Sequence, residues 1–174
     1  MGILPELVEE RSVSLEEVLL SREARQDRQR AWMSRYEMTI VSLTIVVPGE
    51  FKDTRLSRQA FNMAWQALDA LSLEKGWRTA AKEIFCRPTG PEGLIAIDLP
   101  AEDVKRASVE LEQQSAVGRL WDIDVIGKDG ILSRQAFGLS PRRCLVCERD
   151  ARVCARERTH SLQALNQAME ALFL

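Results

Sequence analysis

The sequence predicts a single α+β domain of 174 residues with a ferredoxin-like βαββαβ core sheet. Short runs rich in β-branched residues alternate with longer segments whose apolar residues recur at helical spacing. No internal repeat or low-complexity linker divides the chain. We expect an N-terminal helical segment over residues 1–36, the α+β core over residues 38–133, and a Cys-rich helical C-terminus over residues 140–174.

The first half of the chain supplies the first three strands. A helix is expected from Ser14, because "SLEE" has the spacing of a capping box. The run "MTIVSLTIVV" is typical of a central strand. Over residues 54–75 the spacing predicts a helix that Gly76 ends. We expect two further strands in "WRTAAKEIFC" and "LIAID", joined by a turn at "TGPEG".

The second half supplies a helix, the fourth strand and a C-terminal helix. "PAEDVKRASVELEQQ" opens with proline and two acids, as helices often do. "RLWDIDVI" follows as a strand, and "GKDG" turns it into a short hairpin partner. The last helix is expected to begin near Thr159 or Ser161 and to bury Leu162, Leu165, Met169 and Leu172. With a 4-1-3-2 strand order, "PGEFK", Asp98 and "GRLWD" should gather at one edge of the sheet.

The composition excludes several classes of protein. The 24 Lys and Arg residues against 26 Asp and Glu residues give a net charge of −2, so no global basic field attracts nucleic acid. No run approaches the roughly 18 consecutive apolar residues of a membrane span. The acidic start lacks the pattern of a signal peptide. We therefore expect a cytoplasmic protein whose four cysteines are reduced thiols or metal ligands.

Two carboxylates stand side by side on the fourth strand. Asp122 and Asp124 point to the same face of an extended chain, which is unfavourable unless water or a cation separates them. The pair could hold Mg²⁺, with Arg119 adding donors for phosphate. The alternative is a strand with acids on its solvated face, and the spacing alone favours that alternative.

The turn "PGEFK" follows the first strand. Backbone N–H groups near Gly49, together with Lys52, could hold phosphate. The simpler interpretation of this turn alone is an ordinary loop with a solvated lysine. In the same way, Arg22, Arg25 and Arg28 lie along one side of the first helix and could meet an acidic partner, but a solvated helix face is the preferred interpretation.

The C-terminal segment contains the spacing C-x2-C-x6-C-x5-H. Three thiolates and an imidazole can complete a closed tetrahedral zinc site. On a helix, however, the three cysteines would form one small apolar stripe without any ligand role. The spacing does not distinguish these two interpretations of Cys144, Cys147, Cys154 and His160.

Five motifs follow one another along nearly the whole chain. They are "LPELVEERSVSLEEVLLSREARQDRQ", "VVPGEFKDT", "GPEGLIAID", "LEQQSAVGRLWDIDV" and "PRRCLVCERDARVCARERTH". Taken together and in this order, they resemble a known family, holo-citrate lyase synthase, the apo-citrate lyase phosphoribosyl-dephospho-CoA transferases.

The resemblance implies a nucleotidyltransferase. Its donor would be 2′-(5″-triphosphoribosyl)-3′-dephospho-CoA and its acceptor a serine of the acyl carrier (gamma) subunit of citrate lyase, with release of pyrophosphate. Mg²⁺ is the expected cofactor, and Zn²⁺ is a candidate for the Cys/His group. The expected site comprises the Mg²⁺ ligands and catalytic acids Asp122 and Asp124, the catalytic and phosphate-binding Arg119, and the substrate-binding residues Lys52, Gly49 and Asp98.

A second hypothesis from another class remains open. The chain could be a non-enzymatic, zinc-stabilised module that binds a partner protein through its arginine-bearing first helix. Dependence of a transfer reaction on Asp122 and Asp124 would separate the two hypotheses.

Overall fold

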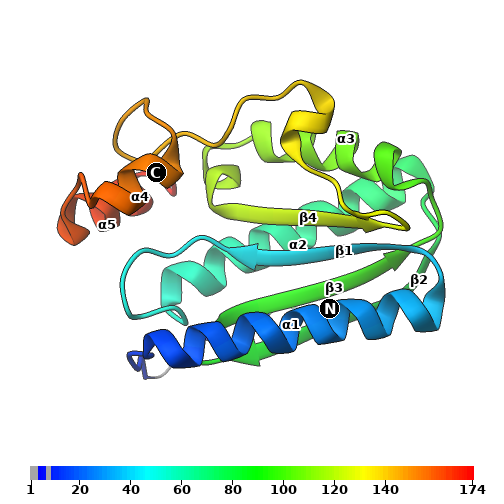
Figure 1. Cartoon of the computed structure of the whole chain (residues 1–174), viewed down its shortest axis with the longest axis horizontal. Helices are drawn as coiled ribbons and strands as arrows, with labels where there is room; N and C mark the ends of the chain where they lie inside the picture. Colours follow the sequence, from blue (N-terminus) through cyan, green and yellow to red (C-terminus); the bar gives the residue numbers. More distant parts are fainter. Residues whose placement is uncertain (1–3, 7–8) are drawn as a thin grey trace.

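The computed structural model describes residues 4–6 and 9–174, so part of the expected 1–36 segment lies outside the described residues. It is an α+β fold with one five-stranded antiparallel sheet in the order β2-β3-β1-β4-β5 (Figure 1). The first four strands thus have the predicted 4-1-3-2 order, and the short β5 is added outside β4. The strands are β1 (Thr39–Ile45), β2 (Thr79–Arg87), β3 (Gly90–Ile97), β4 (Trp121–Gly127) and β5 (Gly130–Ile131).

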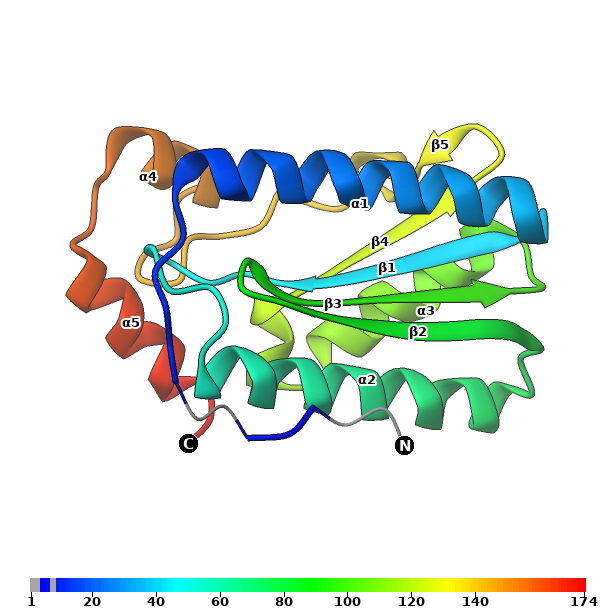
Figure 2. The same ribbon diagram turned by 90° about the horizontal axis from the view of Figure 1, so that it is seen from below.

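Helices cover both faces of this sheet. Figure 2 shows α1 crossing one face, whereas α2 and α3 lie against the other. The two C-terminal helices lie beyond the end of the sheet, near the loop that follows β1 (Figure 1). The α-helices are α1 (Leu15–Tyr36), α2 (Arg55–Lys75), α3 (Ala101–Gln113), α4 (Ala151–Glu157) and α5 (Leu162–Ala171), and the 3₁₀ helices are η1 (Ala116–Leu120) and η2 (Arg134–Phe137). No helix of the described ranges is long and apolar enough to cross a membrane.

The two faces of the sheet differ in what they bury. The main core lies between the sheet and α2–α3, where Phe61 and Trp65 stack beneath the strands. A smaller apolar cluster lies on the α1 face, where Ile40 and Leu94 meet Trp32 from the C-terminal half of the helix. The N-terminal half of α1 adds nothing to this cluster, since its Leu15, Leu19 and Leu20 are exposed, and it lies over a polar end of the same face. Asp122 and Asp124, near the start of β4, lie at this end.

Local sequence signals predicted most helix ends correctly. Ser14 caps α1 in a complete capping box with Glu17. Gly76 ends α2 in the left-handed conformation, with φ of 66°. Ser161 caps α5 by accepting a bond from the N–H of Ala164. The hairpin partner after "GKDG" is also confirmed as β5.

Three expectations about the sheet and the last helix were wrong. The turn at "TGPEG" is confined to residues 88–89, because β3 already begins at Gly90. Of the four apolar residues expected to be buried in α5, only Met169 is buried, and Leu165 and Leu172 are half-buried. Leu162 is 49% exposed, because it begins α5 and lies beside the loop at Gly49 rather than in the main core. Asp98 lies at the other end of the sheet from "PGEFK", because β3 runs antiparallel to β1 and pairs Ile97 with Thr39. Its carboxylate is 3.9 Å from Arg78 on the exposed surface.

We predict that Gly118→Ala destabilises the fold. A Cβ at this position would lie 2.1 Å from the carbonyl oxygen of Glu112, so η1 would have to move away from the end of α3. We expect a loss of about 1–3 kcal/mol in the free energy of unfolding, measured by urea denaturation. Ser115→Ala is the control, since this side chain makes no capping bond. Equal stability of the two variants would contradict the close approach.

Candidate functional site

The end of β1 and the start of β4 meet, as the strand order predicted. Ile45 pairs with Trp121, and the N–H of Val46 donates to the carbonyl oxygen of Leu120 at 2.8 Å. The loop that contains Gly49 and the 3₁₀ helix that contains Arg119 therefore leave the sheet from adjacent strands. The structure brings these two segments to one end of the sheet and leaves Asp98 at the other.

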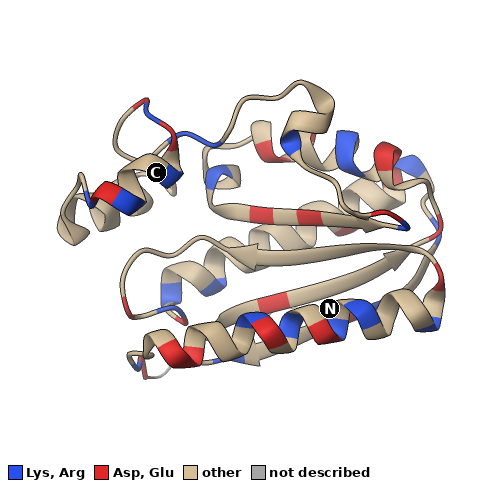
Figure 3. Ribbon diagram, in the orientation of Figure 1, with Lys and Arg blue, Asp and Glu red and all other residues tan. Residues whose placement is uncertain are grey.

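The aspartate pair lies on the face of the sheet that α1 crosses. Asp122 is opposite Thr44 and Asp124 is opposite Ser42 in the β1–β4 ladder. Both acids are half-buried, whereas their neighbours Trp121 and Ile123 point into the main core. Figure 3 shows these two acidic positions of β4 in the same view as the charged α1. The solvated-face interpretation is therefore incomplete, since water reaches only part of each carboxylate.

The charged form of Asp124 is destabilised by its surroundings. Burial, and then the negative charge of Asp122, raise the pKa of Asp124 to about 6. Three cations oppose this rise, namely Lys105, Arg142 and Arg25. Their combined effect is too small to restore the ordinary acidity of Asp124. A proton or an added cation would therefore stabilise the pair.

Two basic side chains bind the free outer edge of β4. Arg142 donates through Nη2 to the carbonyl oxygen of Trp121 at 2.7 Å, and the same atom lies 3.6 Å from Oδ1 of Asp122. Lys105 donates through Nζ to the carbonyl oxygen of Ile123 at 3.0 Å. Sequence reasoning missed both residues. Neither belongs to a motif with the aspartates, and only the tertiary fold brings them together.

Helix α1 contributes a second polar cluster on the same face. Arg25 pairs with Glu92, and Nη2 of Arg28 lies 2.8 Å from the other oxygen of that carboxylate. Gln29 donates to the hydroxyl of Ser42 at 2.9 Å. The interpretation of this helix face as solvated was therefore wrong for Arg25 and Arg28. Their ion pairs with the buried Glu92 anchor α1 over the polar end of the sheet.

The predicted phosphate-binding residues have protein partners in the structure. Lys52 donates to the carbonyl oxygen of Val47 at 2.6 Å, and its pKa is lowered by burial and then by the charge of Arg22. Gly49 has φ of +85°, and a Cβ there would lie 2.9 Å from Leu162 of α5. The loop thus packs closely against the C-terminal helix.

Arg119 connects the sheet to the C-terminal segment. Its Nη2 atom donates to the carbonyl oxygens of Arg143 and Cys144, the latter at 2.8 Å. The described contacts do not join Arg119 or Lys52 to the aspartates directly. Their roles toward phosphate stay predictions.

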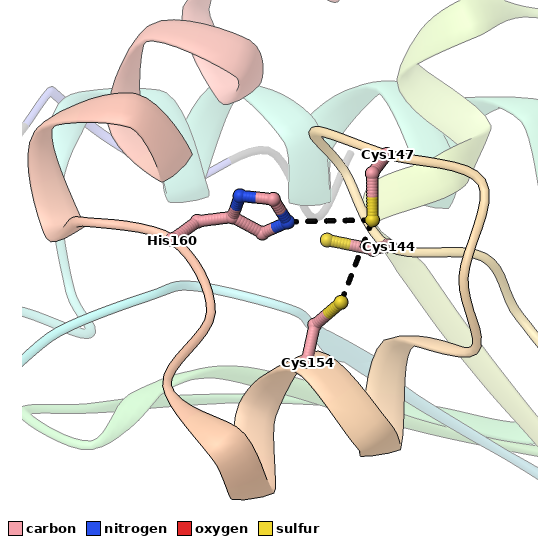
Figure 4. A group of neighbouring side chains, drawn as sticks. All are labelled: Cys144, Cys147, Cys154 and His160. Atoms are coloured by element: carbon pink, nitrogen blue, oxygen red, sulfur yellow. Dashed lines mark hydrogen bonds between the residues drawn. The ribbon is translucent and has the colours of Figure 1, made fainter.

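The Cys/His residues converge into one group, as Figure 4 shows. One ligand atom from each of the four residues lies within 4.8 Å of the others, and His160 Nε2 is 3.3 Å from the sulfur of Cys147. The sulfurs of Cys147 and Cys154 are 3.5 Å apart. The helical-stripe interpretation was wrong, since Cys144 and Cys147 precede α4. The group could bind a metal ion.

Comparisons with known proteins agree with this arrangement of motifs. The family described as apo-citrate lyase phosphoribosyl-dephospho-CoA transferase matches residues 13–174. Proteins of that name from Escherichia coli O7:K1 and from Shigella boydii serotype 18 are each 47% identical to the chain over 173 residues. Each alignment covers 99% of this chain and 94% of the relative.

We predict that Asp124→Asn stabilises the metal-free protein at pH 7. The raised pKa of Asp124 means that its contribution to stability is fully present below its unfolded value of about 3.8 and is lost as the pH rises through about 6. The variant should therefore gain roughly 1–2 kcal/mol at pH 7, and this advantage should shrink as the pH falls toward 4.

Urea denaturation at pH 7 and pH 4 tests this expectation. Asp129→Asn, in the exposed β4–β5 turn, removes the same charge and should change stability little at either pH. An advantage of Asp124→Asn that is equal at both pH values would contradict the assignment of the raised pKa to this residue.

Proposed function

The chain belongs to the family of apo-citrate lyase phosphoribosyl-dephospho-CoA transferases, and from this premise we propose the reaction that it performs. A serine oxygen of the acyl carrier subunit of citrate lyase attacks the innermost phosphorus of 2′-(5″-triphosphoribosyl)-3′-dephospho-CoA. A new phosphorus–oxygen bond forms, the bond to the next phosphate breaks, and pyrophosphate leaves. The carrier gains a phosphodiester-linked prosthetic group. The cytoplasm is the proposed location.

The aspartate pair on β4 is the observation that carries the proposed site. Carboxylate oxygens are the ligands that Mg²⁺ prefers in proteins. Burial and then the charge of Asp122 raise the pKa of Asp124, so a bound cation would stabilise its charged form. Asp122 and Asp124 would hold this ion. When bound, Mg²⁺ would supply positive charge against the oxygens of the transferred phosphate.

The protein's own side chains carry out the remaining steps. One carboxylate of the pair accepts the serine proton as the oxygen attacks. Phosphoryl transfer depends mostly on positioning and on neutralising charge, so the cations at the strand ends bind and orient the donor. Arg119 and Lys52 contact phosphate oxygens in this proposal, and the turn at Gly49 closes the site beside them. Arg142 holds Asp122 in place from the edge of β4.

We also propose that the Cys3His group binds zinc. Three thiolates and one imidazole match the ligands of closed, tetrahedral structural zinc sites. The backbone N–H of Val146 donates to the sulfur of Cys144 at 3.5 Å, and a hydrogen bond of this kind stabilises a thiolate. Because Arg119 binds the carbonyl oxygens of residues 143 and 144, this zinc would hold the C-terminal segment against the transferase site. The non-enzymatic alternative is not favoured by the comparisons.

We predict that Asp122→Asn and Asp124→Asn each abolish transfer without unfolding the protein. Loss of a metal-binding carboxylate removes several kcal/mol of transition-state stabilisation, so the rate should fall about a hundredfold or more. The measurement is the intact mass of the carrier subunit after incubation with the donor, Mg²⁺ and each variant. Asp129→Asn should transfer at the normal rate. Near-normal turnover in both site variants would restore the solvated-face interpretation.

We predict about one zinc ion per chain in protein purified without chelators. A strong chelator or Cys147→Ser should loosen residues 140–174, because ligand loss removes the metal's contribution to folding. Metal analysis and hydrogen exchange measure the two effects. Cys86→Ser is the matched control, since this exposed cysteine lies outside the group. Protein that contains no zinc and protects this segment equally well would rule out the site.

A further inference from the structure

A cavity of about 790 Å³ lies between the end of α3, η1 and the segment that leads to the Cys3His group. Its charged lining residues are four arginines and one glutamate. These are Arg119, Arg134, Arg142, Arg143 and Glu112. The four cations come from three parts of the chain, η1, η2 and the loop before α4, so no sequence motif unites them. The cavity therefore has an excess of three positive charges.

Glu112 orients two of the four guanidinium groups. Its carboxylate is buried in α3 and lies 3.1 Å from Nη1 of Arg134 and 3.2 Å from Nη2 of Arg142. Burial raises the pKa of Glu112, and the charges of Arg142, Lys105 and Arg134 oppose that rise. One carboxylate neutralises at most one of the two arginines that it holds. The other positive charges remain available to a ligand.

Arg142 joins this cavity to the aspartate pair. The same Nη2 atom contacts Glu112 in the cavity wall and lies 3.6 Å from Asp122 on β4. An anion in the cavity would therefore lie one side chain away from the proposed reacting centre. Arg143, which is exposed, makes none of the ion pairs found among the described residues, and its guanidinium is the freest of the four.

We propose that this arginine cavity binds a phosphate chain of the donor. The proposal rests on the proposed function and adds Arg134, Arg142 and Arg143 to the substrate-binding residues. Guanidinium groups match phosphate oxygens with paired donors, and a preformed group of them binds anions without further ordering. The donor has two phosphate chains, its triphosphate and the diphosphate of its dephospho-CoA moiety. Both have the chemistry that the cavity recognises.

Calorimetric titration of the full-length protein with inorganic tripolyphosphate, and separately with 3′-dephospho-CoA, tests the proposal without Mg²⁺. The wild-type protein should bind at least one probe saturably, with an affinity that falls as salt is added. Arg143→Ala and Arg134→Ala should each raise the dissociation constant about tenfold or more. Arg149→Ala removes the same charge outside the cavity, and its dissociation constant should stay within about twofold of wild type.

The two probes identify the bound end of the donor. Tripolyphosphate binding that Arg143→Ala weakens assigns the cavity to the triphosphate, and dephospho-CoA binding that it weakens assigns the cavity to the diphosphate. Arg143→Lys should recover part of the lost affinity, because it restores the charge without the paired donors. Thermal melting confirms that each variant is folded. No saturable binding of either probe, or unchanged affinity in both alanine variants, would overturn the proposal.

The same proteins separate this proposal from the proposed function. If the wild-type protein binds a probe in the cavity but never increases the mass of the carrier, the anion site is supported and the transfer reaction is refuted. If the protein modifies the carrier but Arg143→Ala and Arg134→Ala leave the KM for the donor unchanged, the role of the cavity in donor binding is refuted and the transfer reaction is supported.

Discussion

The pairing of β4 with β1 in a single register is the constraint on which the proposed site depends. This register places Asp122 and Asp124 opposite Thr44 and Ser42 on the α1 face. A shift of one residue would turn both acids into the main core and expel Trp121. The outer edge of β4 has no full partner strand, since β5 pairs with only its last two residues. Basic side chains from other elements donate to the carbonyl oxygens of Trp121 and Ile123 along that edge.

The basic side chains at the edge of β4 connect this strand to α3, through Lys105, and to the loop before α4, through Arg142. A carbonyl oxygen left unpaired in a buried place costs about 1–3 kcal/mol, so Arg142 and Lys105 stabilise the fold as donors to the strand. They also place positive charge beside two carboxylates that repel one another. The side chains that complete the strand edge therefore also lie beside the proposed site. The arginine that completes the sheet edge is also the link between the aspartates and the cavity.

The sequence predicted the parts of this arrangement that depend on near neighbours. The capping box at Ser14 and the placement of both aspartates on one face follow from residues only a few positions apart. The end of the sheet that a residue reaches depends on the direction of its strand. The prediction for Asp98 was wrong because β3 runs antiparallel to β1. Arg142 and Lys105 could not be predicted, since their partners are backbone oxygens that any residue type would supply. The partner of Arg25 could not be predicted either, because Glu92 is 67 residues away along the chain.

The make-up of the C-terminal segment explains why the proposed metal site would lie beside the cation-rich cavity. Over residues 140–174 only Cys144, Cys154 and Met169 are buried, too few apolar side chains to hold such a segment by packing alone. Ligand bonds from a metal would replace the missing core. The segment positions Arg142 and Arg143 immediately before the first cysteine, and Arg119 binds the backbone at that point. The Cys3His group would therefore fix the arginines rather than take part in the chemistry, and the enzyme would gain a rigid anion site from a region with almost no core.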